Sequence, residues 1–64
     1  MESYIIDRTK PNWTIIKGNT RTIVAYFDNG RKETMPLLKF LTMKTGKRKK
    51  VFKIDCYTEG EKIE

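Results

Sequence analysis

Residues 20–35 read TRTIVAYFDNGRKETM and carry the clearest structural pattern in the chain. The first eight of these residues are rich in β-branched and aromatic side chains, which favour a strand. Asn29-Gly30 is a strong hairpin signal, because both residues tolerate positive φ. The polar segment 31–35 that follows is typical of an edge strand. This stretch therefore predicts two antiparallel strands joined by a tight turn.

A further strand is predicted before this hairpin, at residues 13–17, with the sequence WTIIK. Gly18-Asn19, which separates it from the next strand, is a second pair suited to a hairpin turn. Together the three segments predict an antiparallel meander over residues 13–35.

The length of the turn after Phe27 decides which side chains share a face of the sheet. With a two-residue turn, Met35 lies on the same face as Trp13 and Tyr26. With a three-residue loop and a bulge, Met35 instead joins Ile23 and Phe27. The sequence leaves both registers open, and it also leaves open whether the face of Trp13 and Tyr26 is core or exposed.

A short helix is predicted over residues 36–45, because Pro36 suits a first helical position and Gly46 suits the residue after a helix. Its apolar side chains make one arc that is expected to pack on the sheet: Leu37, Leu38, Phe40 and Leu41.

A final strand is predicted at residues 51–58, where alternation turns Phe52, Ile54 and Cys56 inward. Residues 4–6 are expected to add a short strand, and residues 60–64 to form a frayed tail. A lone cysteine on the inward face of a strand is typical of a small buried hydrophobe, so Cys56 is expected in the core.

These elements predict a single small α+β domain over residues 1–64. Three strands followed by a helix, from Trp13 to Gly46, is an element order similar to that of the small three-stranded DNA-binding domains of some phage and transposon integrases. A shared element order does not confer a function. The same elements are also compatible with closure into a small SH3-like or OB-like barrel.

Several classes of function are disfavoured by composition. The 64 residues include no histidine and one cysteine, which excludes an internal disulfide and a multi-cysteine zinc site. No glycine-rich phosphate loop occurs, and no general base stands near the single serine. We therefore expect no enzyme activity, no metal and no cofactor. The lack of a signal-peptide pattern and of a long apolar run favours a cytoplasmic protein with no membrane contact.

Positive charge is the strongest functional signal, since the chain has 14 Lys and Arg against 8 Asp and Glu. No acidic residue lies between Glu33 and Asp55. Five cations cluster within seven positions: Lys44, Lys47, Arg48, Lys49 and Lys50. Such a cluster attracts an anionic partner, although a solvated loop that keeps the protein soluble is the plainer interpretation.

We therefore predict a nucleic-acid-binding module, with DNA and RNA both left open. The cluster at residues 44–50 would contact phosphates, and Arg31 and Lys32 would reach a second phosphate row. Trp13, Tyr26 and Lys17 would orient the ligand or stack on its bases from one sheet face.

An alternative is a small regulator or inhibitor, of the kind found as accessory factors of phages and mobile elements, that docks on an acidic protein surface. In that case Trp13, Tyr57 or Met43 would be exposed anchor residues. Either protein is expected to be a monomer or a weak homodimer.

Overall fold

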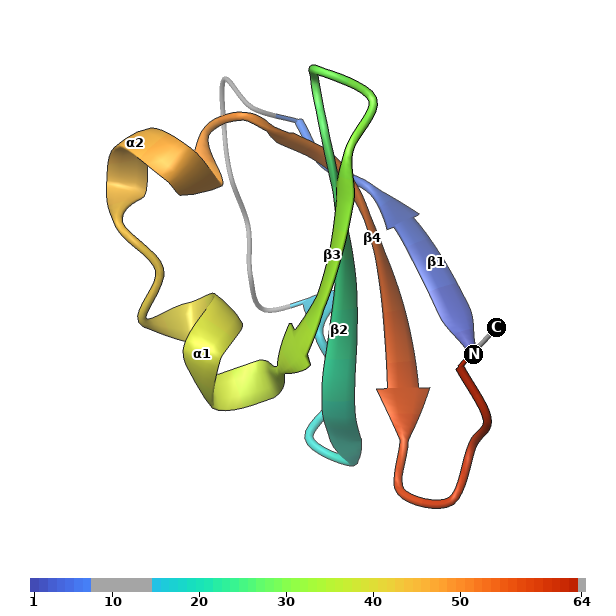
Figure 1. Ribbon diagram of the computed structural model, residues 1–64. Coiled ribbons are helices and arrows are strands. Elements are labelled where there is room, and N and C mark those ends of the chain that lie inside the picture. Colours follow the sequence, from blue (N-terminus) through green and yellow to red (C-terminus); the bar gives the residue numbers. More distant parts are fainter. Residues whose placement is uncertain (8–14, 64) are drawn as a thin grey trace.

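The computed structural model describes residues 1–7 and 15–63. Within them, four strands form one antiparallel sheet in the order β1-β4-β2-β3. Two short helices lie on one face of this sheet, which we call the inner face (Figure 1). The elements are β1 (Glu2–Ile5), β2 (Thr20–Phe27), β3 (Lys32–Pro36), α1 (Leu37–Leu41), α2 (Thr45–Arg48) and β4 (Val51–Thr58). The prediction of a small α+β fold with an antiparallel sheet is confirmed.

The hairpin of β2 and β3 has the longer of the two predicted turns. The Phe27 N–H donates to the Arg31 carbonyl at 2.8 Å, and the Gly30 N–H donates to the Phe27 carbonyl at 3.0 Å. Residues 28–30 therefore form a three-residue loop, and Gly30 supplies the positive φ of 84° that this loop requires. Ile23 consequently pairs with Met35. The register with the three-residue loop is correct, and the two-residue register is wrong.

The strand predicted at residues 13–17 is not found in the part of it that the structure describes. Trp13 lies outside the described residues, while Ile15 and Ile16 form a short turn and pack half-buried against the core. The chain does turn at Gly18-Asn19, where the Thr20 N–H donates to the Lys17 carbonyl at 3.0 Å.

β4 occupies the edge of β2 that the predicted hairpin would have used. Pairing along two eight-residue strands gives more ladder hydrogen bonds than the short segment 15–17 offers. The described strands are therefore not in the consecutive order that resembles the integrase domains. Over residues 1–7 and 15–63, the sheet ends at β1 and β3 and is not closed into a barrel.

The helix predicted over residues 36–45 is found only as the shorter α1, and α2, which begins at Thr45 and continues past the predicted end, was not expected. α1 ends at Leu41, and the hydroxyl of the next residue, Thr42, donates back to the Leu38 carbonyl at 3.0 Å. Such back-bonding competes with the continuing backbone ladder. Gly46 lies inside α2, so its predicted place after a helix is wrong.

A helix as short as α1 presents only one side chain fully to the sheet. Phe40 is 0% exposed, whereas Leu38 is 72% exposed and Leu41 is also exposed. The prediction that all four apolar residues of this segment pack on the sheet is therefore wrong for Leu38 and Leu41. Leu37 packs partly buried against the core.

β4 departs from simple alternation near its start. Its register with β2 shifts between the pairs Tyr26–Lys53 and Phe27–Val51, so one extra residue is accommodated in β4. Val51 is consequently 0% exposed and lies in the core, while Phe52 is 39% exposed. The predicted inward position of Phe52 is wrong, whereas the inward positions of Ile54 and Cys56 are confirmed.

The core fills the space between the inner face of the sheet and α1. Its buried side chains are Ile6, Ile23, Ala25, Phe27, Met35, Phe40, Val51, Ile54 and Cys56. Burial raises the pKa of the Cys56 thiol, as expected of a cysteine that acts as a core residue. In the described part of the chain, no helix is long and apolar enough to cross a bilayer.

Candidate nucleic-acid interface

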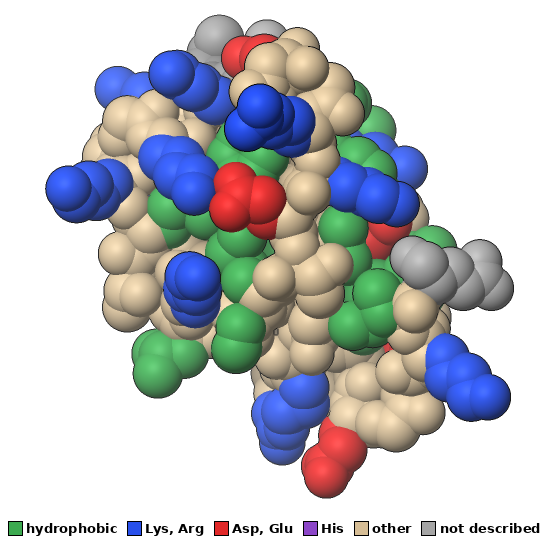
Figure 2. Space-filling view, viewed as in Figure 1, with side chains coloured by type: hydrophobic (Ala, Val, Ile, Leu, Met, Phe, Trp, Pro, Cys, Tyr) green, Lys and Arg blue, Asp and Glu red, His purple; other side chains and the backbone are tan. Residues whose placement is uncertain are grey.

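The β2–β3 loop and α2 lie at the same end of the sheet although they are distant in sequence. The Asp28 N–H donates to the Lys50 carbonyl at 3.0 Å and so joins the loop to the start of β4. We call this region the basic end, and its cationic residues are Arg31, Lys44, Lys47, Arg48, Lys49 and Lys50. Figure 2 shows Lys and Arg side chains gathered over this region, with an acidic side chain among them. The structure thus brings Arg31 together with the cluster at residues 44–50.

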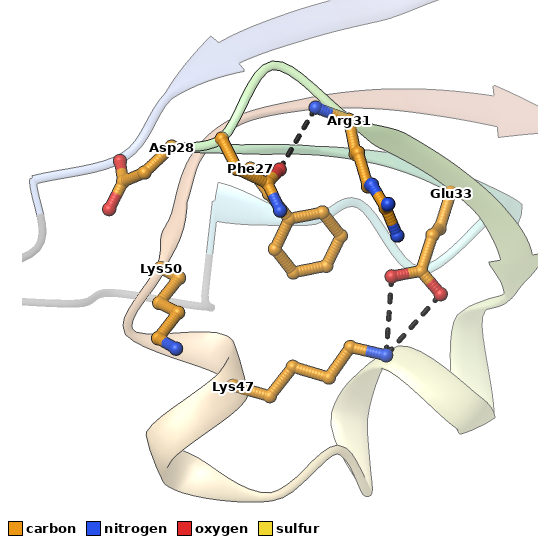
Figure 3. Close-up of a pocket in the computed structure, with 7 residues that line it drawn as sticks. Phe27, Asp28, Arg31, Glu33, Lys47 and Lys50 are labelled. Atoms are coloured by element: carbon orange, nitrogen blue, oxygen red, sulfur yellow. Dashed lines mark hydrogen bonds and ion pairs between the residues drawn. The ribbon is translucent and has the colours of Figure 1, made fainter.

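An open hollow of about 610 Å³ lies between the loop and α2 (Figure 3). Its lining residues come from β2, the loop, β3 and the α2–β4 region: Phe27, Asp28, Asn29, Arg31, Glu33, Lys47 and Lys50. Strand alternation explains why Glu33 of β3 and Arg31, the residue before β3, both lie on the inner face. The hollow is within the size range of small-ligand sites in proteins.

An ion pair crosses the hollow. The Lys47 ammonium group lies 3.2 Å from Glu33 Oε2 and 3.3 Å from Glu33 Oε1. The same ammonium group lies 5.6 Å from the centre of the Phe27 ring. The side chains of Lys47 and Glu33 are 52% and 46% exposed, so water screens their attraction. Surface pairs of this kind contribute at most about 1 kcal/mol, which makes the pair exchangeable.

The other cations of the basic end differ in their partners. Arg48 donates to the Leu41 carbonyl at 3.1 Å and so connects α2 to the end of α1. Within the described ranges, Arg31, Lys44, Lys49 and Lys50 form no salt bridge. Their charge is available to an external anion.

The remaining predicted binding residues lie elsewhere. Lys32 and Tyr26 pair across β2 and β3 and face the outer side of the sheet, opposite the helices. Lys32 directly follows Arg31, and Tyr26 directly precedes Phe27. Because neighbouring strand residues point to opposite faces, Lys32 and Tyr26 point away from the hollow. Lys17 lies near the opposite end of β2, where it pairs with Glu2 at 2.7 Å. Trp13 is outside the described residues.

The outer face instead holds a hydrogen-bonded cluster around Asp55. This carboxylate is buried and accepts hydrogen bonds from the Ser3 hydroxyl at 2.6 Å and the Tyr26 hydroxyl at 2.7 Å. Lys53 lies over the Tyr26 ring, 4.8 Å from its centre, and 3.9 Å from Asp55 Oδ1. Tyr57 is also buried, so its predicted role as an exposed anchor is wrong.

Competing effects set the pKa of Asp55. Burial alone would raise it, but the hydrogen bonds from Ser3 and Tyr26, with Lys53 and Lys32 nearby, hold the pKa below its ordinary value. The hydrogen bond to Asp55 is also the largest cause of the raised pKa of Tyr26. The two hydrogen bonds to Asp55 join β1 and β2 to β4, so we assign this cluster a structural role.

Sequence reasoning missed four lining residues of the hollow: Phe27, Asp28, Asn29 and Glu33. The three-residue register would have indicated Glu33, because that register places Arg31, Glu33 and Met35 on one face with Phe27. No group of three or more His, Cys, Asp or Glu side chains gathers as a metal site in the described residues. Comparisons with protein-family models, characterised proteins and solved structures find no significant match to this chain.

Proposed function

We propose that this protein is a non-enzymatic nucleic-acid-binding module that contacts the phosphate backbone through its basic end. The observation that carries this proposal is the convergence of Arg31 with Lys47 and Lys50 around one hollow, from segments distant in the sequence. Lys44 and Lys49 extend the same charge along α2 as exposed side chains. Phosphate contacts of this kind supply most of the affinity of sequence-independent binding.

The proposed interface is smaller than the sequence suggests. Tyr26 donates its hydroxyl to Asp55 on the outer face, so it is not part of the basic end. Lys17 is paired with Glu2 at the far end of β2. The proposal therefore depends on cations alone and carries no claim of base stacking.

Two matched triple variants test this assignment. The first, Lys47→Gln, Lys49→Gln and Lys50→Gln, removes three charges from the basic end. The second, Lys17→Gln, Arg21→Gln and Lys62→Gln, removes three charges from residues outside that end. Both retain long polar side chains, and circular dichroism checks that both remain folded. Their affinities for labelled single-stranded and duplex oligonucleotides are then compared at one low salt concentration.

We expect the first variant to lose at least about tenfold in affinity, because three phosphate contacts disappear. The second variant should lose clearly less, since only long-range attraction is reduced. Equal losses in both variants would mean that net charge alone drives binding, and the basic end would then have no special role.

One observation favours a second candidate function, docking on an acidic protein surface. Leu38 and Leu41 are exposed on α1, where Lys39 directly follows Leu38 and Lys44 lies three residues after Leu41. A mixed apolar and cationic surface is typical of protein interfaces with an acidic partner. A nuclease-resistant partner in affinity capture, together with no oligonucleotide binding, would favour this function over the first.

A further inference from the structure

The hollow at the basic end contains a bound anionic group that belongs to the protein itself. Both carboxylate oxygens of Glu33 lie within 3.3 Å of the Lys47 ammonium group. Figure 3 shows the side chain of Arg31 extending toward the same carboxylate, while the carboxylate of Asp28 points away from it. The position of Glu33 therefore marks a place where Lys47 holds an anion, with the Arg31 side chain directed toward it.

The arrangement of these cations is convergent. Arg31, Lys47 and Lys50 line one concave space, whereas Lys44 and Lys49 are outside it. Convergent charges fit a compact anion with several acceptor oxygens better than they fit one monoanionic link of a backbone. A phosphate monoester carries a charge of about −1.5 to −2 at neutral pH and has three terminal oxygens.

We infer that the hollow is a subsite for a phosphate monoester, the terminal phosphate of a nucleic-acid strand, and that this group displaces the Glu33 carboxylate from Lys47. This inference rests on the proposed function, because it takes the strand end as the source of the monoester. Breaking the exposed ion pair between Lys47 and Glu33 costs little free energy. Glu33 therefore occupies the subsite when no ligand is bound, and an anion of higher charge can replace it.

The test compares oligonucleotides of one sequence that carry either a 5′-phosphate, a 3′-phosphate or hydroxyl groups at both ends. At pH 7.5 and constant salt, the wild-type protein should bind a phosphorylated strand at least about fivefold more tightly than the unphosphorylated strand. Lys47→Gln should abolish this preference. Lys49→Gln is the matched control: it should weaken binding of all strands by a similar factor and leave the preference unchanged.

Glu33→Gln should change the preference for the phosphorylated strand in the opposite direction to Lys47→Gln. Removing the competing carboxylate should tighten binding of the phosphorylated strand by up to about fivefold, the effect of releasing a surface ion pair. The unphosphorylated strand does not enter the hollow and should gain less, so the preference should grow. Equal tightening of both strands would show that Glu33 acts only through long-range repulsion and would overturn the inference.

A pH comparison identifies the charge on the ligand. The second pKa of a phosphate monoester is about 6, so at pH 5 the terminal group is mostly a monoanion and the preference should shrink to less than about twofold. The charged groups that face the ligand are Arg31, Lys47, Lys50, Glu33 and, at the rim, Asp28. Glu33→Gln should show the same loss at pH 5, which assigns the titration to the phosphate.

The outcomes also separate this inference from the proposed function. Tight, salt-dependent binding that is equal for phosphorylated and unphosphorylated strands would overturn the subsite and leave the proposed function in place. Competition by inorganic phosphate or a mononucleotide, with no binding of any oligonucleotide, would support the monoester subsite and overturn the strand end as its source. Binding of a phosphoserine peptide but of no oligonucleotide would likewise support the monoester subsite and overturn the strand end as its source.

Discussion

At the scale of single residues, Asp55 is the side chain that sequence reasoning treated most incompletely. Alternation with the inward residues Ile54 and Cys56 correctly places Asp55 on the outer face. Asp55 is nevertheless buried there, and it accepts hydrogen bonds from Ser3 and Tyr26. A buried carboxylate is stable only when its charge is compensated, and this cluster supplies the compensation. Such a cluster depends on three strands that meet only after folding, so no local pattern could have predicted it.

The lowered pKa of Asp55 predicts how stability depends on pH. A carboxyl group whose folded pKa lies below its ordinary value of 3.8 contributes stability that is fully present above that value. The contribution is lost as the pH falls through the folded pKa. Asp55→Asn should therefore cost about 1–3 kcal/mol at pH 7, because one acceptor replaces two charged ones.

Urea unfolding of the wild-type protein and Asp55→Asn at pH 7 and at pH 2.5 measures this contribution. The difference in free energy of unfolding should narrow at the lower pH, because pH 2.5 lies below the ordinary pKa of 3.8 and the unfolded state of the wild-type protein then binds a proton at Asp55. A difference that is the same at both pH values would show that the variant acts through packing and not through charge.

Phe40 and Leu38, two neighbours on α1, differ sharply in burial. Phe40→Ala should cost about 3–5 kcal/mol, because a fully buried aromatic side chain leaves a cavity. That loss is comparable to the whole stability of a chain this small, so the variant should be largely unfolded at 25 °C. Leu38→Ala should change the free energy of unfolding by less than about 0.5 kcal/mol. Similar losses from both substitutions in thermal unfolding would contradict the observed burial.

At the scale of elements, the two glycines of the basic end should respond to substitution with opposite signs. Gly30 has a φ of 84°, which alanine adopts only with strain, so Gly30→Ala should destabilise the protein by about 1 kcal/mol. Gly46 lies inside α2 without a positive φ, and an added Cβ would meet no atom within 4 Å. Gly46→Ala should therefore stabilise it by about 0.4–1 kcal/mol.

Midpoints of chemical unfolding for the two variants measure this contrast. A destabilising Gly46→Ala would indicate that Gly46 ends a helix, as its sequence context suggests, and would contradict the position of α2. A Gly30→Ala variant whose unfolding midpoint equals that of the wild-type protein would contradict the three-residue loop.

The elements that the sequence predicted well are those specified by local pattern. β2, β3 and β4 each have a clear run of strand-forming residues, and Asn29-Gly30 marks the turn between the first two. The segment 15–17 was misassigned because its apolar residues suit either a strand or a loop that covers a core. β4, which lies more than twenty residues away in the sequence, pairs with the edge of β2 where this segment was expected. Non-local pairing of this kind is not encoded in any short window.

At the scale of the whole molecule, the candidate site was partly predictable. The charge cluster at residues 44–50 is visible in the sequence, and Arg31 was included because it follows a turn. Their adjacency is a tertiary result of the contact between Asp28 and Lys50. The prediction that Tyr26 and Lys17 share this surface depends on the two-residue register, which is wrong, and on a strand that is not found in residues 15–17.

The arrangement of charge also predicts how the molecule responds to salt. Cations of the basic end that neutralise phosphates should release the counterions condensed on the nucleic acid. The logarithm of the binding constant should therefore fall linearly with the logarithm of salt concentration. Six cations form the basic end, one of which also contacts the Leu41 carbonyl and another Glu33. With four or five phosphates neutralised, the slope for duplex DNA should be about −4, at about 0.9 per phosphate.

The most direct test is therefore a titration of the wild-type protein with labelled single-stranded and duplex oligonucleotides over 50–200 mM salt. We predict micromolar or tighter binding at the low end and a linear decline with a slope of about −3 to −5 for the duplex. Absence of binding to DNA and to RNA even in the most dilute buffer, or binding that salt does not weaken, would contradict nucleic-acid recognition by the basic end.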